Sequence, residues 1–288
     1  MTAGAQGRRA MSPQLRVHCF NVSSDGFGAG EDQSLERPFG HADPAALFSW
    51  AGATASWVNR ADPGGSQGLD DYFTRDMSRN IGAEIMGRNK FGPQRGPWID
   101  HQWKGWWGDT PPFHTPVFVL THHVRPSFTL SDTTFHFVDV APAEALRQAL
   151  AAVGGMDVRL GGGVATIREF LEADLIDTMH IAVAPVELGS GERLWDSPDD
   201  LLDRYHLDTV PSPSGVTHLL FWRRSPRRTR LAGGGSTEVV APPASGEHDE
   251  RDAGGEEHRR DTQGDATVAA GFGEVDDLRS RERRLGGG

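Results

Sequence analysis

The sequence is poor in cysteine: Cys19 is the single cysteine among 288 residues. It cannot form an internal disulfide, and it lies in an apolar run, so we expect a buried free thiol in a protein of a reducing compartment. No apolar run approaches the roughly 20 residues that a membrane-spanning helix needs. Residues 1–14 have no apolar stretch after their arginines, which argues against a secretory signal. These absences predict a cytoplasmic protein without a membrane partner.

A basic surface stripe is also missing. The formal net charge is -11, and the arginines near the C-terminus alternate with acids. Because a surface that binds nucleic acid needs clustered Lys and Arg, we expect no nucleic-acid partner. The adjacent His122 and His123 do not predict a metal site. Neighbouring side chains on a strand face opposite ways, and no third ligand stands at a usual spacing.

Apolar and aromatic residues thin out after residue 224. From 225 to 288 the chain is rich in Gly, Pro and mixed charge, and Phe272 is its one aromatic residue. Such a segment buries too little apolar surface to offset its chain entropy, so we predict a disordered tail. Residues 1–14 are predicted to form a flexible N-terminus, which leaves one folded domain over 15–224.

Strand-like and helix-like patterns alternate within that domain. Eight runs of β-branched and apolar residues are bounded by turn signals, and 69–80 and 142–153 show helical spacing. The stretch over 157–186 gives a strand, a glycine turn, a helix and a second strand. The last two strands are separated by Ser-Pro-Ser, which predicts a hairpin. The order predicts an α/β domain with a mostly parallel sheet, flanking helices and an antiparallel C-terminal edge.

The glycine turn over 161–163 stands where a strand ends and a helix begins. The first amides of a helix have no partner within it, and glycines let a ligand approach them closely. The turn therefore predicts either a phosphate-binding cradle or a tight turn with no ligand. It is not a P-loop, because Val-Ala-Thr follows in place of a Lys-Ser or Lys-Thr pair. A Rossmann fingerprint does not fit either, since it needs a small residue at 166 and usually lies at the first strand.

Four separated stretches resemble one family. They are NVSSDGFGAG (21–30), AEIMGRNKFG (83–92), TPVFVLTHH (115–123) and RLGGGVATIREFLEADLIDTMHIAVAPVELGSGERLW (159–195). The last is the most specific, because it joins the glycine turn to a Pro-Val-x-Leu-Gly-x-Gly strand exit. These motifs are similar to the dihydrofolate reductase-like superfamily, and within it to the reductase (C-terminal) domain of bacterial riboflavin-biosynthesis deaminase-reductase proteins. The zinc deaminase signature of the bifunctional members is not present.

The resemblance implies a three-layer fold with a mixed eight-stranded sheet, NADPH as the cofactor, and a homodimer. It places the pyrophosphate of the cofactor on the glycine turn and the adenosine end near 87–90 and 121–122. Arg88 and Lys90 would supply positive charge that favours NADPH over NADH, unless they form only a solvated helix start. Lysine is scarce in this chain, so Lys90 in a motif is informative. The implied cofactor-binding residues are Ser24, Gly87, Arg88, Asn89, Lys90, Thr121, His122, Gly161, Gly162, Gly163, Val164, Ala165 and Thr166.

Asp25 is the candidate catalytic residue. In the family its loop borders the nicotinamide and the substrate. A carboxylate there could anchor or protonate a substrate nitrogen, a role that needs a raised pKa in a shielded pocket. The alternative is an Asp-Gly turn whose carboxylate bonds only nearby amides.

The loop over 93–114 carries four tryptophans, Trp98, Trp103, Trp106 and Trp107. They could stack on a planar substrate ring or close a lid over the site. Equally, they could pack the loop onto the body of the domain or form an oligomer contact.

The residues and the resemblance together predict an NADPH-dependent oxidoreductase that transfers hydride to a small heterocyclic, pyrimidine- or pterin-type substrate. Its narrowest form is the 5-amino-6-(5-phosphoribosylamino)uracil reductase step of riboflavin biosynthesis. The alternative is a non-catalytic NADPH-binding or interaction protein that retains the fold. A nucleotide hydrolase is not supported, because neither a P-loop nor paired carboxylates for magnesium are present.

Overall fold

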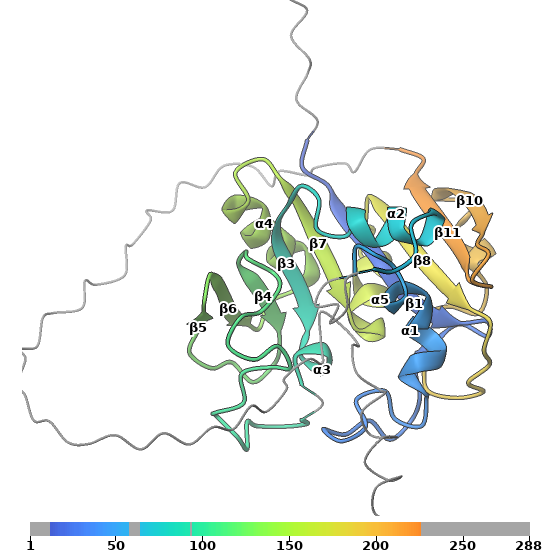
Figure 1. The fold of residues 1–288 in the computed structure, drawn as a ribbon. Coiled ribbons are helices and arrows are strands. Elements are labelled where there is room, and N and C mark those ends of the chain that lie inside the picture. Colours follow the sequence, from blue (N-terminus) through green and yellow to red (C-terminus); the bar gives the residue numbers. More distant parts are fainter. Residues whose placement is uncertain (1–11, 58–63, 93, 226–288) are drawn as a thin grey trace, which may run out of the picture. The chain divides into compact units, whose positions relative to one another are not determined.

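The computed structural model describes residues 12–57, 64–92 and 94–225 (Figure 1). The predicted tail over 225–288 and the predicted flexible N-terminus over 1–14 lie almost entirely outside the described residues. No helix within the described ranges is both long enough and apolar enough to cross a membrane.

One large mixed sheet organises the domain, with its strands in the order β10-β11-β8-β1-β7-β3-β4-β6-β5. Neighbouring strands from β8 to β6 run parallel, while β11 and β10 continue antiparallel at one edge and β5 at the other. The strands are β1 (Leu15–Ser23), β3 (Ile81–Gly87), β4 (Val117–Leu120), β5 (Phe128–Leu130), β6 (Thr133–Val138), β7 (Asp157–Gly162), β8 (Thr178–Ala184), β10 (Tyr205–Pro211) and β11 (Thr217–Arg223). The eight predicted strands and the final hairpin are confirmed, and the short β5 is an addition.

Two short strands, β2 (Phe27–Ala29) and β9 (Glu192–Arg193), pair outside the main sheet. This pairing joins the loop that follows β1 to the loop that follows β8. Both loops therefore lie at the edge of the sheet where the parallel strands end.

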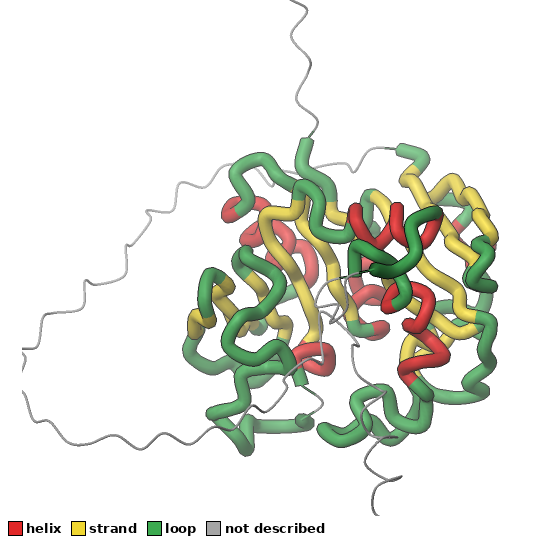
Figure 2. The backbone as a smooth tube through the Cα atoms, in the orientation of Figure 1, coloured by secondary structure: helices red, strands yellow, loops and turns green. Residues whose placement is uncertain are grey.

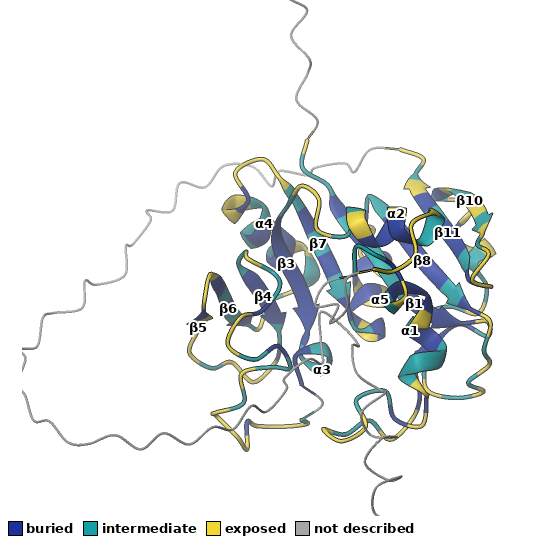
Figure 3. Ribbon diagram, in the orientation of Figure 1, coloured by how far each residue is buried: buried dark blue, intermediate teal, exposed yellow. Residues whose placement is uncertain are grey.

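Helices cover both faces of the sheet and give three layers (Figure 2). On one face, Leu146 and Ile167 join the main core, and on the other Trp50 and Phe73 pack against Ala182. The helices are α1 (Pro44–Gly52), α2 (Leu69–Asp76), α3 (Arg88–Phe91), α4 (Pro142–Ala152), α5 (Val164–Glu172) and the 3-10 helix η1 (Pro198–Leu201). The central strands are consequently buried on both sides (Figure 3), which explains their nearly continuous apolar sequences.

The apolar spacing of α5 fixes how this helix sits on the sheet. Val164, Ile167, Phe170 and Leu171 recur at three- and four-residue intervals and are buried, whereas 168–169 are exposed. This buried stripe holds α5 against the sheet directly after β7. The N-terminus of the helix therefore lies at the edge where the parallel strands end.

The tryptophan-rich loop packs onto the domain. Trp98 and Trp107 are only 7% and 6% exposed and belong to a core with Phe91. The guanidinium carbon of Arg125 lies 4.4 Å from the ring centre of Trp98, and its Nη2 donates to the carbonyl of Trp103 at 2.7 Å. These contacts favour the packing interpretation of the loop over a free lid.

Candidate active site

A cavity of about 830 Å³ opens at the edge where β1, β3, β4 and β7 end. This is the edge at which parallel sheets bind ligands, and the volume is typical of a site for a cofactor or drug-sized molecule. The predicted site residues that line the cavity are Gly87, Arg88, Asn89, Lys90, Thr121, His122, Gly161, Gly163, Val164, Ala165 and Thr166. Three that do not line it are Gly162, Ser24 and Asp25.

The glycine turn opens the first amides of α5 to the cavity. Gly163 is the N-cap residue, no side chain caps this helix, and its first turn holds no acid. A Cβ added at Gly163 would meet nothing within 4 Å, whereas one at Gly162 would lie 2.9 Å from the ring of Phe20. Gly162 also has a φ of 103°, which favours glycine. Gly162 is therefore a glycine because the turn requires it, and Gly163 leaves open a space through which an anion could reach the helix amides.

Buried polar atoms without a hydrogen-bond partner gather on the segment that follows β3. Among the described residues they include Nε and Nη2 of Arg88, Oδ1 of Asn89 and Oε1 of Gln94. All three residues line the cavity. Such atoms are rare in folded proteins and call for a partner, so the segment fits a polar ligand or ordered water.

Arg88 is held against the tryptophan-rich loop. Its guanidinium carbon lies 4.0 Å from the ring centre of Trp98, and its Nη1 donates to the carbonyl of Gly96. Burial is the main cause that lowers the pKa of Arg88, and the nearby charge of Arg95 lowers it further. Arg88 and Arg95 thus place two positive charges at this end of the cavity.

Lys90 belongs to a compact charged group that we call the Glu84 cluster, which consists of Glu84, Lys90 and Arg159. The Nζ of Lys90 donates to Oε1 of Glu84 at 3.1 Å and to the carbonyl of Gly161 at 2.9 Å. The Nε of Arg159 donates to the other oxygen of Glu84 at 2.5 Å. A Cβ added at Gly161 would collide with this cluster. Gly161 is therefore a glycine because the cluster packs against it, and Lys90 is not a merely solvated helix residue.

Thr121 and His122 follow β4 at the same edge, as predicted. The Thr121 hydroxyl accepts a hydrogen bond from the amide of His123 at 3.1 Å. The exposed ring of His122 has its Nδ1 2.9 Å from the carboxylate of Asp139. Both residues line the same cavity as Arg88.

Asp25 is engaged in the turn rather than directed into the cavity. Its carboxylate accepts hydrogen bonds from the Ser23 hydroxyl at 2.6 Å and from the amides of Leu188 and Gly189 at 3.1 and 2.7 Å. Burial raises the pKa of Asp25, but these hydrogen bonds outweigh burial and the net shift is downward. The raised pKa that a proton-donating role would need is therefore not found at Asp25. The geometry supports the alternative, in which the carboxylate ties its loop to the chain after β8; Ser24 contacts that chain too.

We expect Asp25→Asn to lower the free energy of unfolding by about 1–3 kcal/mol, because the amide cannot accept all three hydrogen bonds. The affinity for a nicotinamide cofactor in the cavity should stay unchanged, since Asp25 does not line the cavity. Urea unfolding and a cofactor titration measure the two quantities, with Asp109→Asn at an exposed position as the control. A variant as stable as the wild type but without turnover would restore Asp25 as the catalytic residue.

A bulge in β1 shapes the wall of the cavity beside this turn. The register between β1 and β8 shifts between Val17 and Phe20, and Cys19 adopts a φ of 52°. Residues other than glycine rarely adopt this conformation, and bulges of this kind redirect side chains near functional sites. The bulge brings the side chains of His18 and Cys19 to the cavity wall.

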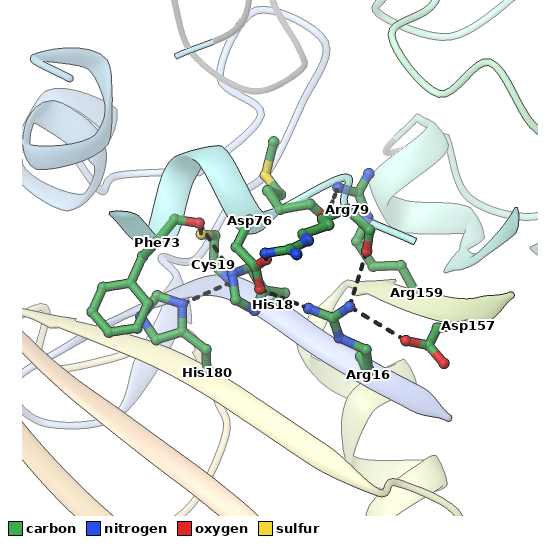
Figure 4. A network of polar contacts seen from close by, with 10 residues as sticks. Arg16, His18, Cys19, Phe73, Asp76, Arg79, Asp157, Arg159 and His180 are labelled. Carbon is green, nitrogen blue, oxygen red and sulfur yellow. Dashed lines mark hydrogen bonds and ion pairs between the residues drawn. The ribbon is translucent and has the colours of Figure 1, made fainter. Parts of the chain in front are cut away.

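A chain of hydrogen bonds from the neighbouring strands β8 and β11 supports the bulge. Figure 4 shows the first contact of this chain, between Cys19 and His180. The Cys19 amide donates to Nδ1 of His180 at 3.2 Å, so a neutral His180 carries its proton on Nε2. That Nε2 donates to Nδ1 of His218 at 2.9 Å, and Nε2 of His218 donates to Asp70 at 2.8 Å. Each link fixes the tautomer of the next, so the chain runs in one direction from the bulge to Asp70.

Two residues of this hydrogen-bond chain, Cys19 and His180, also belong to the one group in the described ranges that could hold a metal ion. Their ligand atoms and that of His18 lie within 4.8 Å of one another. Burial raises the pKa of the Cys19 thiol, which opposes the thiolate that a metal needs, and Sγ donates to the carbonyl of Phe73. Both ring nitrogens of His180 are already hydrogen-bonded. The geometry favours a hydrogen-bonded wall over a metal centre.

Sequence reasoning missed Glu84, Arg159 and the histidine chain. An acid in the otherwise apolar stretch AEIM was the available signal for Glu84, because a carboxylate in a buried strand requires a partner. The partner itself, Arg159, lies 75 residues away and had no local signal.

The mostly parallel sheet, its two helical layers and the cavity at the strand ends define a dihydrofolate reductase-like α/β protein. Over residues 18–211 the sequence matches the RibD C-terminal domain family, and the chain belongs to that family. The resemblance to the reductase domain of riboflavin-biosynthesis proteins is therefore confirmed.

Solved structures similar to this chain bear related descriptions. A candidate riboflavin biosynthesis protein from Shewanella sp. PV-4 is 21% identical, with 75% of this chain and 100% of that chain covered and a TM-score of 0.44. A pyrimidine reductase-like protein from Corynebacterium diphtheriae is 14% identical over 73% and 92%, with a TM-score of 0.41. A diaminohydroxyphosphoribosylaminopyrimidine deaminase/5-amino-6-(5-phosphoribosylamino)uracil reductase from Thermotoga maritima is 12% identical over 74% and 57%, with a TM-score of 0.42. No curated protein sequence matches the chain.

Proposed function

We propose that the protein is an NADPH-dependent reductase of a small heterocyclic substrate. The observation that carries this proposal is the uncapped N-terminus of α5, which opens into the cavity at Gly163. Amides and a helix dipole directed at open space suit a phosphate group, and the family membership agrees with a reductase.

The residues present fit a dinucleotide along the cavity. Gly163, Val164 and Ala165 would hold its pyrophosphate at the helix amides, where an added Cβ at Gly163 would otherwise fill the space. Arg88 and Arg95 would attract the 2'-phosphate at the other end, which favours NADPH over NADH. When bound, the reduced nicotinamide supplies hydride. The remaining cavity, lined by residues of the β1 bulge and the tryptophan-rich loop, would take the substrate.

The narrowest form of the proposal is reduction of 5-amino-6-(5-phosphoribosylamino)uracil, on the strength of the family membership. We further propose that the protein acts as a cytoplasmic homodimer, following the same family resemblance. The alternative hypothesis is a non-catalytic NADPH-binding protein, and one assay distinguishes it from an enzyme. With this uracil derivative or a related pyrimidine, the enzyme consumes NADPH, whereas the non-catalytic protein binds NADPH without consuming it.

Thermal unfolding with NADPH, NADP⁺, NADH or no nucleotide tests the cofactor. At about 100 times its dissociation constant a ligand stabilises the folded state by roughly 2.7 kcal/mol. We expect NADPH and NADP⁺ to raise the melting temperature and NADH to raise it less. Equal melting temperatures under all four conditions would contradict the proposal.

A further inference from the structure

The Glu84 cluster carries a surplus positive charge at the wall of the cavity. Glu84 contributes one negative charge and is only 1% exposed, while Lys90 and Arg159 contribute two positive charges. Both cations line the cavity, and Glu84 does not. A charge that is not balanced within a partly buried site is unfavourable until an anion or a strongly polar oxygen approaches it.

Hydrogen-bond donors of the cluster remain available on the cavity side. Lys90 uses two of the three N–H groups of its ammonium, on Glu84 and Gly161. Arg159 uses Nε on Glu84 and Nη1 on the carbonyl of Met77 at 3.4 Å. The Nη2 of Arg159 has no hydrogen-bond partner within the described residues. This atom is not buried, so solvent or a ligand can reach it.

Aromatic side chains lie beside these donors and elsewhere on the cavity wall, and they favour a flat ligand. The guanidinium carbon of Arg159 lies 5.9 Å from the ring centre of Phe113, and the indole of Trp106 donates to the carbonyl of Lys90 at 3.0 Å. Phe20 and Trp57 also line this cavity. Flat apolar walls with two adjacent donors suit a planar ring that presents an oxygen-bearing edge.

We propose that the Glu84 cluster binds the oxo or carboxylate edge of a planar substrate ring, and that Lys90 donates the proton that completes the reduction. This inference rests on the proposed reductase function and names the part of the site that recognises the substrate. Glu84 holds both cations in place and makes no contact with the substrate.

A substrate C=O or C=N bond receives hydride from the reduced nicotinamide at carbon, and the π electron pair moves to the oxygen or nitrogen. The ammonium of Lys90 transfers a proton to that atom, so a C–H and an O–H or N–H bond form. The nicotinamide is left oxidised, and the neutral Lys90 amine regains a proton from water. Burial, the largest influence, lowers the pKa of Lys90, which eases proton release, while Glu84 opposes this shift and Arg159 adds to it.

Binding of two uracil probes tests the subsite without any turnover. Orotate carries a carboxylate on a pyrimidine ring, and uracil lacks it. We expect the wild-type protein to bind orotate about tenfold or more tightly than uracil in calorimetric titrations, because a charged hydrogen bond separates them. Arg159→Met and Lys90→Met should each reduce this ratio toward one. Lys104→Met and Arg168→Met, at exposed positions outside the cavity, should leave it unchanged.

A second variant separates proton donation from binding and from folding. Lys90→Arg retains the positive charge but donates a proton poorly. With the phosphoribosylaminouracil substrate, we expect kcat to fall by about 100-fold while KM and NADPH affinity change little. An orotate-to-uracil ratio of one in the folded wild type, or full kcat in Lys90→Arg, would overturn this inference. If the wild-type protein does not bind NADPH, the proposed function itself is overturned.

Discussion

Replacing Gly163 with valine is expected to lower NADPH affinity by about 100-fold or more, which corresponds to the loss of two charge-assisted hydrogen bonds. The valine side chain would collide with the bound ligand and not with the protein. A Cβ at this position meets no protein atom within 4 Å, and it projects where the amides of α5 open to the cavity. The φ of Gly163 is -68°, which any residue adopts. Fluorescence titration with NADPH measures the change.

Gly52→Val is the matched control. An added Cβ at Gly52 also meets nothing within 4 Å, but Gly52 ends α1 and does not line the cavity. It should bind NADPH as the wild type does. If Gly163→Val keeps wild-type affinity and folds normally, the glycine turn is a strand-to-helix connection and the cofactor lies elsewhere.

The glycine turn could be predicted because its signals are local. A strand, three glycines and a helix with apolar residues at 164, 167, 170 and 171 occupy one short stretch, and the buried stripe alone orients α5. The packing of the tryptophan-rich loop was less predictable. It depends on Arg125, which follows β4 and contacts Trp98 from outside the loop.

The lowered pKa of Asp25 could not be predicted, because the hydrogen-bond partners that cause it are distant in sequence. Leu188 and Gly189 lie 163 and 164 residues further along, and their two amides help to outweigh the burial that raises the pKa of this carboxyl. The histidine chain depends in the same way on strand pairing. His180 and His218 meet because β8 and β11 are antiparallel neighbours, with Ala182 opposite His218 in their register. The spacing of the two histidines along the sequence does not predict that register.

The distant contacts also explain how the cavity acquires its chemistry. Strands β3 and β7 are neighbours, so Glu84 and Arg159 stand opposite each other in register, and α3 then brings Lys90 over the same carboxylate. On the other side, the β1 bulge rests on His180. The sheet order, and not any single motif, places a cationic group and a hydrogen-bonded wall on either side of the glycine turn.

Three histidines, the half-buried His18 and the buried His180 and His218, should make the protein sensitive to mild acid. Burial is the main cause that lowers the pKa of His18 from 6.5 to about 4, against an opposing hydrogen bond to Phe73. Burial also lowers the pKa values of His180 and His218. Below pH 6.5 the unfolded chain therefore binds more protons than the folded one, and stability falls as the pH decreases. From pH 6.5 to about pH 5, His18 alone should remove about 1.5 kcal/mol, and His180 and His218 should add to this loss.

Urea unfolding across this pH range measures the effect. The range lies above the pKa values of the hydrogen-bonded carboxyl groups, so the loss of stability there can be assigned to the histidines. The pKa values of Asp25 and Asp70 are lowered from 3.8, so the stability that they contribute is present above that value and is lost only at lower pH. His18→Gln should reduce the pH dependence by about 1.5 kcal/mol, because an amide can donate to Phe73 without titrating. His101→Gln, at an exposed position, should not change it. A stability that stays constant from pH 6.5 to about pH 5 would mean that these histidines open to solvent, and that the wall beside the glycine turn is looser than its hydrogen bonds indicate.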